Sequence, residues 1–246
     1  KDHRIFSNYG TILREHGNLI EAELFTRKAI ELKPNYAIAL FKLSVLELLM
    51  GDYESGLEHY EYRFHLKEHV MYLSNTKINK TNDLKIGKSE QLLIVSEQGY
   101  GDTLQYMRYV PYLRDQGLNI SFIAQRKLHS LIKASGIDSN PLTPEDASKI
   151  SKGKWMPLLS LPRHLKINPN KPIISKPYIF ATDQLQKKWS GILSKEKRPI
   201  IGINWQGNPE MEKIDYQGRS IPLKTFSSLL EGNDVTMLSL QKGFGS

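Results

Sequence analysis

The stretch QLLIVSEQGYGDTLQYMRYVPYLRDQG, residues 91–117, decides the fold class of this 246-residue chain. Its first six residues form a short apolar run that includes β-branched side chains, which is typical of a buried parallel strand. Gly99 and Gly101 follow, and residues 102–116 then place apolar side chains at helical spacing. The stretch therefore predicts a strand, a tight turn and a helix.

The same alternation continues to the end of the chain. Further strands are predicted at residues 119–124, 154–157, 177–180, 199–205 and 235–240. Helices are predicted between them, at residues 126–134, 183–193 and 222–230. Strands that alternate with helices form a mostly parallel sheet with helices on both faces, so we expect an α/β fold.

The first third of the chain is different, because it repeats itself. Gly17 and Gly51 are 34 positions apart, and the same offset pairs Phe6 with Leu40, Tyr9 with Leu43, Gly10 with Ser44, Ala22 with Gly56 and Thr26 with Tyr60. This period, with small residues at matched positions, predicts two tetratricopeptide repeats at residues 3–36 and 37–68, each a helical hairpin. Because stable arrays usually need three or more repeats, we expect further repeats upstream or a cap from the following domain.

The composition excludes several classes of protein. The chain has no cysteine, which rules out disulfide frameworks and cysteine-based metal sites and fits a cytoplasmic protein. No apolar run approaches the roughly 18 residues of a membrane span, and residues 1–10 lack a signal-peptide core. His65 and His69 have the spacing of a helical metal pair but no evident third ligand, so no metal is expected.

The charge balance bears on partners. The chain has 34 Lys and Arg against 26 Asp and Glu, a net charge of +8. Such a surface favours anionic partners such as phosphates, nucleotide sugars or nucleic acid, although a solvated lysine-rich surface is the simpler interpretation. Nucleic acid is the least supported of these partners, because no nucleic-acid-binding motif is recognisable.

The glycine turn at residues 97–101 lies where α/β proteins bind ligands, directly after a strand and before a helix. Glycines let a backbone approach a ligand closely, and the helix N-terminus offers free N–H groups. Asp102 falls at or near the helix N-cap, where capping alone would stabilise the fold by about 1 kcal/mol. Leu104 stands where a dinucleotide fingerprint needs its third glycine, and no Lys-Ser/Thr pair follows to make a phosphate loop.

Several stretches, in order, resemble bacterial tetratricopeptide-linked glycosyltransferases, which are similar to the lipopolysaccharide heptosyltransferases. They are EQGYGDTLQYMRYVPYLRDQG (97–117), LLSLPR (158–163), GINWQGNP (202–209), RSIPLKTFSSLL (219–230) and LSLQKG (238–243). The resemblance implies the GT-B architecture (family 9-like), in which two Rossmann-like domains face each other across a cleft. The nucleotide-sugar donor binds mainly the second domain, and the acceptor faces the first.

Under this resemblance the chain divides into four parts. They are two repeats (residues 1–68), a polar linker (69–90), a Rossmann-like acceptor-side domain (91–196) and the beginning of a donor-side Rossmann-like domain (197–246). The family's Asp-Thr…His stretch, which holds the donor further downstream, has no match here. We therefore expect the donor-side domain to be incomplete in this chain.

The resemblance also implies roles for individual residues. Asp102 matches the family's general base on the acceptor hydroxyl. The donor and acceptor contacts are expected at Glu97, Gln98, Gly99, Gly101, Asn204, Gln206, Asn208, Arg219, Gln241 and Lys242. The substrate would be a nucleotide sugar, with no metal cofactor if basic groups and helix N-termini neutralise the leaving diphosphate.

Two hypotheses of different class stay open. In the first, the chain is a glycosyltransferase, or a piece of one, whose repeats dock a protein or glycan acceptor. In the second, it is a non-catalytic interaction module whose repeats bind a partner peptide in their groove beside an α/β scaffold.

Overall fold

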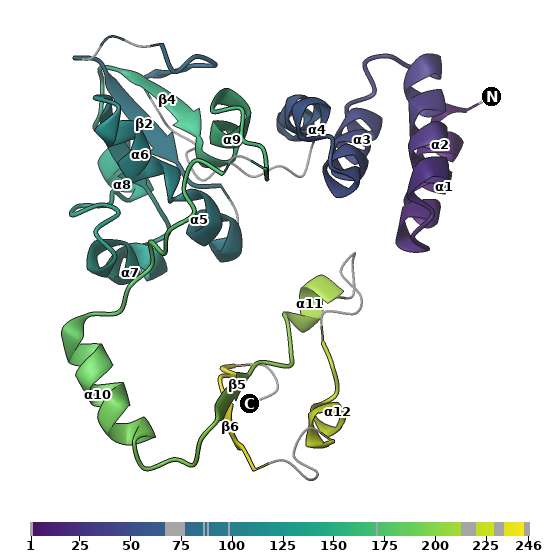
Figure 1. Ribbon diagram of the computed structural model, residues 1–246. Helices are drawn as coiled ribbons and strands as arrows, with labels where there is room; N and C mark the ends of the chain where they lie inside the picture. Colours follow the sequence, from purple (N-terminus) through teal and green to yellow (C-terminus); the bar gives the residue numbers. More distant parts are fainter. Residues whose placement is uncertain are drawn as a thin grey trace. The chain divides into compact units, whose positions relative to one another are not determined.

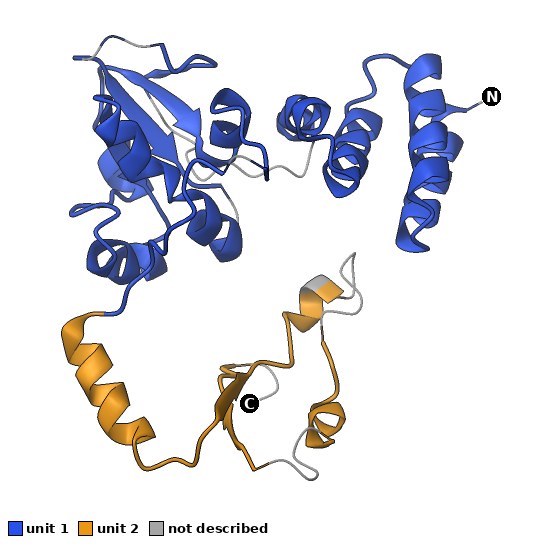
Figure 2. Ribbon diagram, viewed as in Figure 1, with its two compact units in different colours: residues 1–181 blue, residues 182–246 orange. Residues whose placement is uncertain are grey.

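The computed structural model describes residues 2–66, 77–85, 87, 89–97, 99–170, 172–212, 220–228 and 234–243. The chain divides into two compact units, residues 1–181 and 182–246, which Figure 2 colours separately. The first unit consists of an N-terminal helical region followed by a parallel sheet with helices. None of the helices within the described ranges is both long and apolar enough to cross a membrane.

The helical region contains α1 (His3–Glu15), α2 (Leu19–Leu32), α3 (Ala37–Met50) and α4 (Tyr53–Tyr60), which the 3-10 helix η1 (Glu61–His65) prolongs. Figure 1 shows α1 packed against α2 and α3 against α4. The turns within these two pairs contain Gly17 at φ +80° and Gly51 at φ +91°, a backbone region that glycine adopts at little cost.

Small residues let the paired helices approach closely. A Cβ atom built on Gly10 of α1 would lie 2.5 Å from Oγ1 of Thr26 on α2. A Cβ atom on Gly56 of α4 would lie 2.8 Å from Cγ of Leu48 on α3. The glycines therefore fix the spacing of both helix pairs.

The sheet of the first unit contains β1 (Asn79–Lys80), β2 (Gln91–Val95), β3 (Asn119–Ile123) and β4 (Lys154–Pro157). Its strand order is β1-β4-β2-β3 and every pairing is parallel, with Ile94 opposite Phe122 on one side and Met156 on the other. The chain goes from β2 to one neighbour, β3, and then crosses to the opposite neighbour, β4. The strands β3 and β4 thus lie on opposite sides of β2, which makes the carboxyl end of β2 a topological switch point.

The core follows the two-residue period of the strands. Leu92 and Ile94 of β2 belong to one apolar cluster, and Leu93 and Val95 belong to another. The first cluster includes residues of α5 (Tyr100–Tyr106), α6 (Tyr109–Asp115), α7 (His129–Ala134) and α9 (Leu161–His164), and the second includes Ala147 of α8 (Pro144–Ala147). Both faces of β2 are therefore covered, as its apolar sequence predicts. The short 3-10 helices η2 (Arg126–Leu128) and η3 (Leu158–Ser160) precede α7 and α9.

The structure departs from the sequence expectations at three places. The helix expected at residues 102–116 begins at Tyr100 and is split into α5 and α6. The prediction of a strand at residues 177–180 is wrong, because this segment is irregular. It is held by a side chain instead: the Tyr178 hydroxyl donates to the Leu104 carbonyl at 2.8 Å. Residues 79–80, expected in the linker, form β1, which pairs with β4 beside the buried side chain of Ile78.

The second unit contains α10 (Asp183–Leu193), β5 (Ile200–Ile203), α11 (Pro209–Glu212), α12 (Leu223–Ser227) and β6 (Thr236–Ser239). β5 and β6 pair in parallel. α10 belongs to this unit. Among the described residues of the unit none is buried, and Leu185, Trp189 and Ile192 form an exposed apolar stripe along α10.

Candidate functional site

The glycine turn lies at the carboxyl end of β2, at the switch point of the sheet. Gly99 is the N-cap of α5 and has φ +93°, a backbone conformation that residues with a side chain disfavour. A Cβ atom on Gly99 would lie 2.5 Å from Oδ2 of Asp102, which shows that this carboxylate folds back over the glycine. Asp102 is exposed, and it lies in the first turn of α5 rather than at the N-cap.

Hydrogen bonds from the neighbouring strand connection hold this turn. Gln125, just after β3, donates from Nε2 to the Glu97 carbonyl at 2.9 Å. The Thr103 hydroxyl lies 3.1 Å from the Gly99 carbonyl and 3.0 Å from Oε1 of Gln125. Both polar side chains are buried, so the backbone around Gly99 is fixed from inside the protein. Sequence reasoning did not identify either residue.

The main feature of the site is a buried ion pair between the helical region and the sheet. Arg63 of η1 donates from Nε to Oε2 of Glu97 and from Nη2 to Oε1 of Glu97, both at 2.9 Å. The two side chains are each only 3% exposed. Two parallel hydrogen bonds between a guanidinium and a carboxylate are the strongest form of this pair, and burial makes each partner dependent on the other.

The other donors of Arg63 are also used. Nη1 lies 2.7 Å from Oε1 of Glu61 and 3.1 Å from the Tyr60 carbonyl, and Nη2 donates to the Ser160 hydroxyl at 3.0 Å. Ser160 in turn donates to Glu61 at 2.8 Å. Ser160 follows β4, so the cluster joins the carboxyl ends of β2 and β4 to the end of the helical region.

Electrostatic effects follow from this arrangement. Burial alone would raise the pKa of Glu61, but the charge and hydrogen bond of Arg63, together with Ser160 and Lys80, hold it below its usual value. Burial also lowers the pKa of Lys80, whose Nζ lies 3.6 Å from the centre of the Phe64 ring. The cluster therefore places two carboxylates, those of Glu61 and Glu97, around the one guanidinium of Arg63.

Two tyrosines lie within electrostatic range of Asp102. Burial raises the pKa of Tyr60 to about 12; the charge of Arg63 opposes this shift, and the charges of Glu97 and Asp102 add to it. Burial likewise raises the pKa of Tyr106, and the charge of Asp102 is the next cause. Both phenols therefore keep their protons at neutral pH and remain able to donate hydrogen bonds.

The two carboxylates of the turn have different chemistry. Glu97 is buried and is neutralised by Arg63, so it is suited to hold the turn in place. Asp102 is exposed at the start of a helix, so it is accessible to a bound molecule and is suited to accept a proton. Gly101 lies in the same helical turn, where a Cβ atom would meet nothing within 4 Å, so packing does not require a glycine there.

In the second unit the structure brings together two of the residues that the resemblance singled out. Oε1 of Gln241 accepts from the backbone N–H groups of Trp205 and Gln206 at 3.2 and 3.0 Å, and its Nε2 donates to the Gln206 carbonyl at 3.2 Å. One side-chain amide after β6 thus orders the loop that follows β5. The Gly207 N–H donates to Ser220 at 3.1 Å in the same loop.

The remaining sequence-predicted residues are placed as follows. Asn208 precedes α11 and accepts from the Glu210 N–H through Oδ1 at 3.1 Å, so its side chain orders the first turn of that helix. Asn204 and Lys242 are exposed. Gln98 and Arg219 lie outside the described residues.

Comparison with known proteins adds no relatives. No protein-family model matches the chain, and no curated protein matches its sequence. Within the described ranges, no group of three or more His, Cys, Asp or Glu side chains is placed to hold a metal ion.

Proposed function

We propose that this chain is a glycosyltransferase, or part of one, that moves a sugar from a nucleotide-sugar donor to a hydroxyl acceptor. The observation that carries the proposal is the position of Asp102. It is an exposed carboxylate on the first turn of a helix, after a glycine with φ +93°, at the carboxyl end of the strand where the sheet order reverses. Ligands of open α/β sheets bind at this place.

In the proposed reaction Asp102 takes the proton of the acceptor hydroxyl. The hydroxyl oxygen then forms a bond to the anomeric carbon of the donor sugar, and the bond from that carbon to the diphosphate breaks. The nucleoside diphosphate leaves with the electron pair of the broken bond. General-base assistance of this kind contributes about 100- to 10,000-fold to a rate.

The donor is proposed to bind the second unit through the loop after β5. The hydrogen bonds of Gln241 support this assignment, because they fix the backbone N–H groups of Trp205 and Gln206 and the Gln206 carbonyl with one side chain. Asn204, Gln206, Asn208, Arg219 and Lys242 would supply polar and basic contacts to the diphosphate. In this proposal the helical region is a pair of tetratricopeptide repeats and the two units correspond to GT-B domains.

The test is release of nucleoside diphosphate from a panel of UDP-, GDP- and ADP-linked sugars, with neutral saccharides and peptides as acceptors. We expect release from at least one donor, and a loss of at least about 100-fold in Asp102→Asn. The matched control is Asp115→Asn, an exposed aspartate at the end of α6, which should keep full activity. Full activity in Asp102→Asn would refute the base assignment.

The alternative is an interaction module without catalysis. It is favoured by an exposed apolar stripe on α1, where Ile5, Tyr9 and Ile12 are 67%, 44% and 50% exposed at helical spacing. Calorimetric titration with nucleoside diphosphates separates the two functions. A transferase binds at least one of them, whereas no heat at millimolar ligand would support the module.

A further inference from the structure

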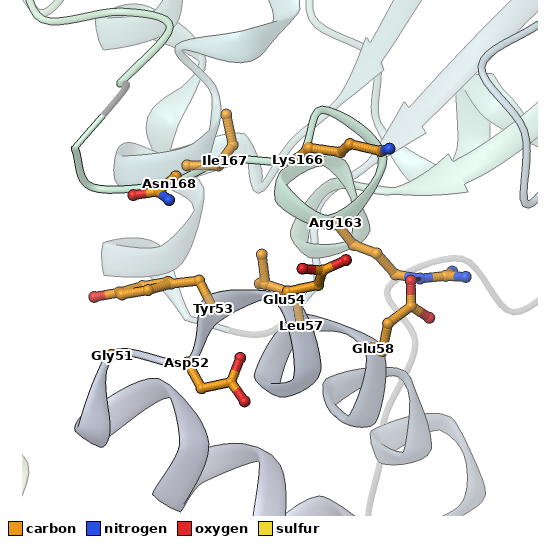
Figure 3. Close-up of a pocket in the computed structure, with 10 residues that line it drawn as sticks. All are labelled: Gly51, Asp52, Tyr53, Glu54, Leu57, Glu58, Arg163, Lys166, Ile167 and Asn168. Atoms are coloured by element: carbon orange, nitrogen blue, oxygen red, sulfur yellow. Dashed lines mark ion pairs between the residues drawn. The ribbon is translucent and has the colours of Figure 1, made fainter.

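A cavity of about 390 Å³ lies within the first unit, away from the glycine turn. One wall is the turn before α4 and the first part of that helix, and the other is α9 with the residues that follow it (Figure 3). None of its lining residues belongs to the cluster of Arg63 and Glu97 or to α5. Its volume falls within the range of about 300–1,000 Å³ that small-molecule sites occupy.

The charges around the cavity nearly cancel. Arg163 on one wall and Glu58 on the other form an ion pair at 2.7 Å between Nε and Oε1, drawn in Figure 3. Asp52 accepts from the Ser55 N–H at 3.1 Å, which caps α4, and this hydrogen bond lowers the pKa of Asp52. The positive end of the α4 dipole offsets much of the remaining charge on Asp52.

Two opposite charges are left for a ligand. Glu54 on the first wall and Lys166 on the second are both exposed. A strongly anionic ligand would meet the carboxylates of Asp52, Glu54 and Glu58. A strongly cationic ligand would meet Arg163 and Lys166 instead. The cavity is therefore suited to a ligand without net charge.

The lining residues also define which hydrogen-bonding groups such a ligand must carry. A carboxylate such as Glu54 only accepts hydrogen bonds, an ammonium such as Lys166 only donates them, and the amide of Asn168 does both. A hydroxyl group donates and accepts at once, so it can satisfy each kind of partner. Tyr53 supplies an aromatic ring, and Leu57 supplies apolar surface for C–H groups.

We propose that this cavity binds a neutral carbohydrate. The recognition combines the Tyr53 ring with hydrogen bonds to Glu54, Lys166 and Asn168, and the Arg163–Glu58 pair holds the two walls together. An extended peptide fits less well, because peptides are usually recognised along a strand edge or an apolar groove. The proposal does not depend on sugar transfer, since it concerns a site whose residues the proposed reaction does not use.

The test is saturation-transfer NMR on the whole chain with glucose, galactose, mannose, N-acetylglucosamine, maltose and lactose. At least one sugar should bind with a dissociation constant in the millimolar range. Glu54→Gln and Asn168→Ala should each weaken this binding, by about tenfold for Glu54, which offers a charged acceptor. Glu21→Gln is the matched control, because Glu21 is an exposed first-turn glutamate of α2 outside the cavity, and it should bind as the unaltered chain does.

Three outcomes would overturn the proposal. The first is no saturation transfer from any sugar at concentrations up to about 50 mM. The second is sugar binding that is equal in Glu54→Gln and Glu21→Gln, which would locate the ligand elsewhere. The third is binding of inorganic phosphate or of a lysine-containing peptide in place of sugar. Transfer activity enters none of these readouts, so failure of the transferase proposal is a separate result.

Discussion

Arg63 and Glu97 are 34 positions apart in the chain, yet they form two hydrogen bonds of 2.9 Å with both side chains nearly inaccessible to solvent. One residue comes from the end of the helical region and the other from the end of the central strand. The pair therefore makes the glycine turn dependent on helices that precede it by tens of residues.

Replacing Arg63 with Ala should cost about 3–5 kcal/mol of unfolding free energy, because it leaves the Glu97 carboxylate buried without its counter-charge. Urea unfolding followed by circular dichroism measures the loss. Arg126→Ala is the control: Arg126 is 78% exposed, lies 4.0 Å from Glu145 and should change stability by less than about 1 kcal/mol. Equal effects of the two substitutions would contradict the structural role of Arg63.

A second variant separates charge from packing at the same place. In Arg63→Met/Glu97→Leu both buried charges are replaced by apolar side chains of similar length. This double variant should recover much of the stability that Arg63→Ala loses, because the deeply buried Glu97 carboxylate is no longer present without its counter-charge, and Glu61, which also loses its partner, is more exposed. A double variant as unstable as Arg63→Ala would mean that the hydrogen bonds to Glu61 and Ser160 matter more than the pair itself.

The raised pKa of Tyr60 predicts a loss of stability in alkaline solution. A tyrosine with a pKa of about 12 when folded and 10.0 when unfolded holds its proton more tightly in the folded state. Its contribution is fully present below pH 10 and is lost as the pH rises toward 12, by up to about 2–3 kcal/mol. Comparing the unfolding free energy at about pH 9 and about pH 11.5 should show a smaller decrease in Tyr60→Phe than in the unaltered chain.

The control for this pH dependence is Tyr9→Phe, which removes a tyrosine that is 44% exposed. It should leave the alkaline decrease unchanged. If Tyr60→Phe shows the same decrease as Tyr9→Phe, other groups cause the alkaline instability.

The glycine turn predicts a substitution whose cost has two parts. Gly99→Ala should lose about 1–3 kcal/mol from its positive φ, and more because the new methyl group meets the Asp102 carboxylate. Gly117→Ala, at φ +84° with nothing within 4 Å of its Cβ position, should show only the backbone cost. In thermal unfolding, adding Asp102→Ala should rescue part of the loss in Gly99→Ala and none of the loss in Gly117→Ala.

The close approach of α1 and α2 predicts that Gly10→Ala destabilises the protein. Alanine is the better helix former, but its methyl group would lie 2.5 Å from Oγ1 of Thr26, and such overpacking costs about 1–3 kcal/mol. Gly101→Ala, with open space at its Cβ position, should be neutral or stabilising by up to about 1 kcal/mol. A stabilised Gly10→Ala variant would show that the two helices separate at little cost.

Much of the fold could be predicted because it depends on local periodicity. The strands β2, β3 and β4 are short apolar runs, and Gly17 and Gly51 mark turns that need a positive φ. The two-residue strand β1 is too short to produce a pattern. The segment around Tyr178 failed as a strand because its hydroxyl, rather than a neighbouring strand, anchors it to Leu104.

The candidate site was predicted only in part. The glycine turn and Asp102 are adjacent in sequence, so local reasoning locates them. Arg63 is charged and lies at the end of a helix, where most arginines face solvent, so nothing local distinguishes it. One signal was available: Glu97 follows a fully apolar strand, and a carboxylate carried into the interior needs a cation from elsewhere in the chain.

The contact of Arg63 with Glu97 makes this helical region specific to its sheet. A chimera that grafts other helices onto residues 77–181 would leave the Glu97 carboxylate buried without a counter-charge unless the graft supplies an arginine at the end of its last helix. The helical region and the sheet are therefore expected to be inherited together, because a recombination that separates Arg63 from Glu97 would remove the contact that holds the glycine turn. The same constraint gives a rule for engineering, since any transplant of this sheet must begin upstream of Tyr60.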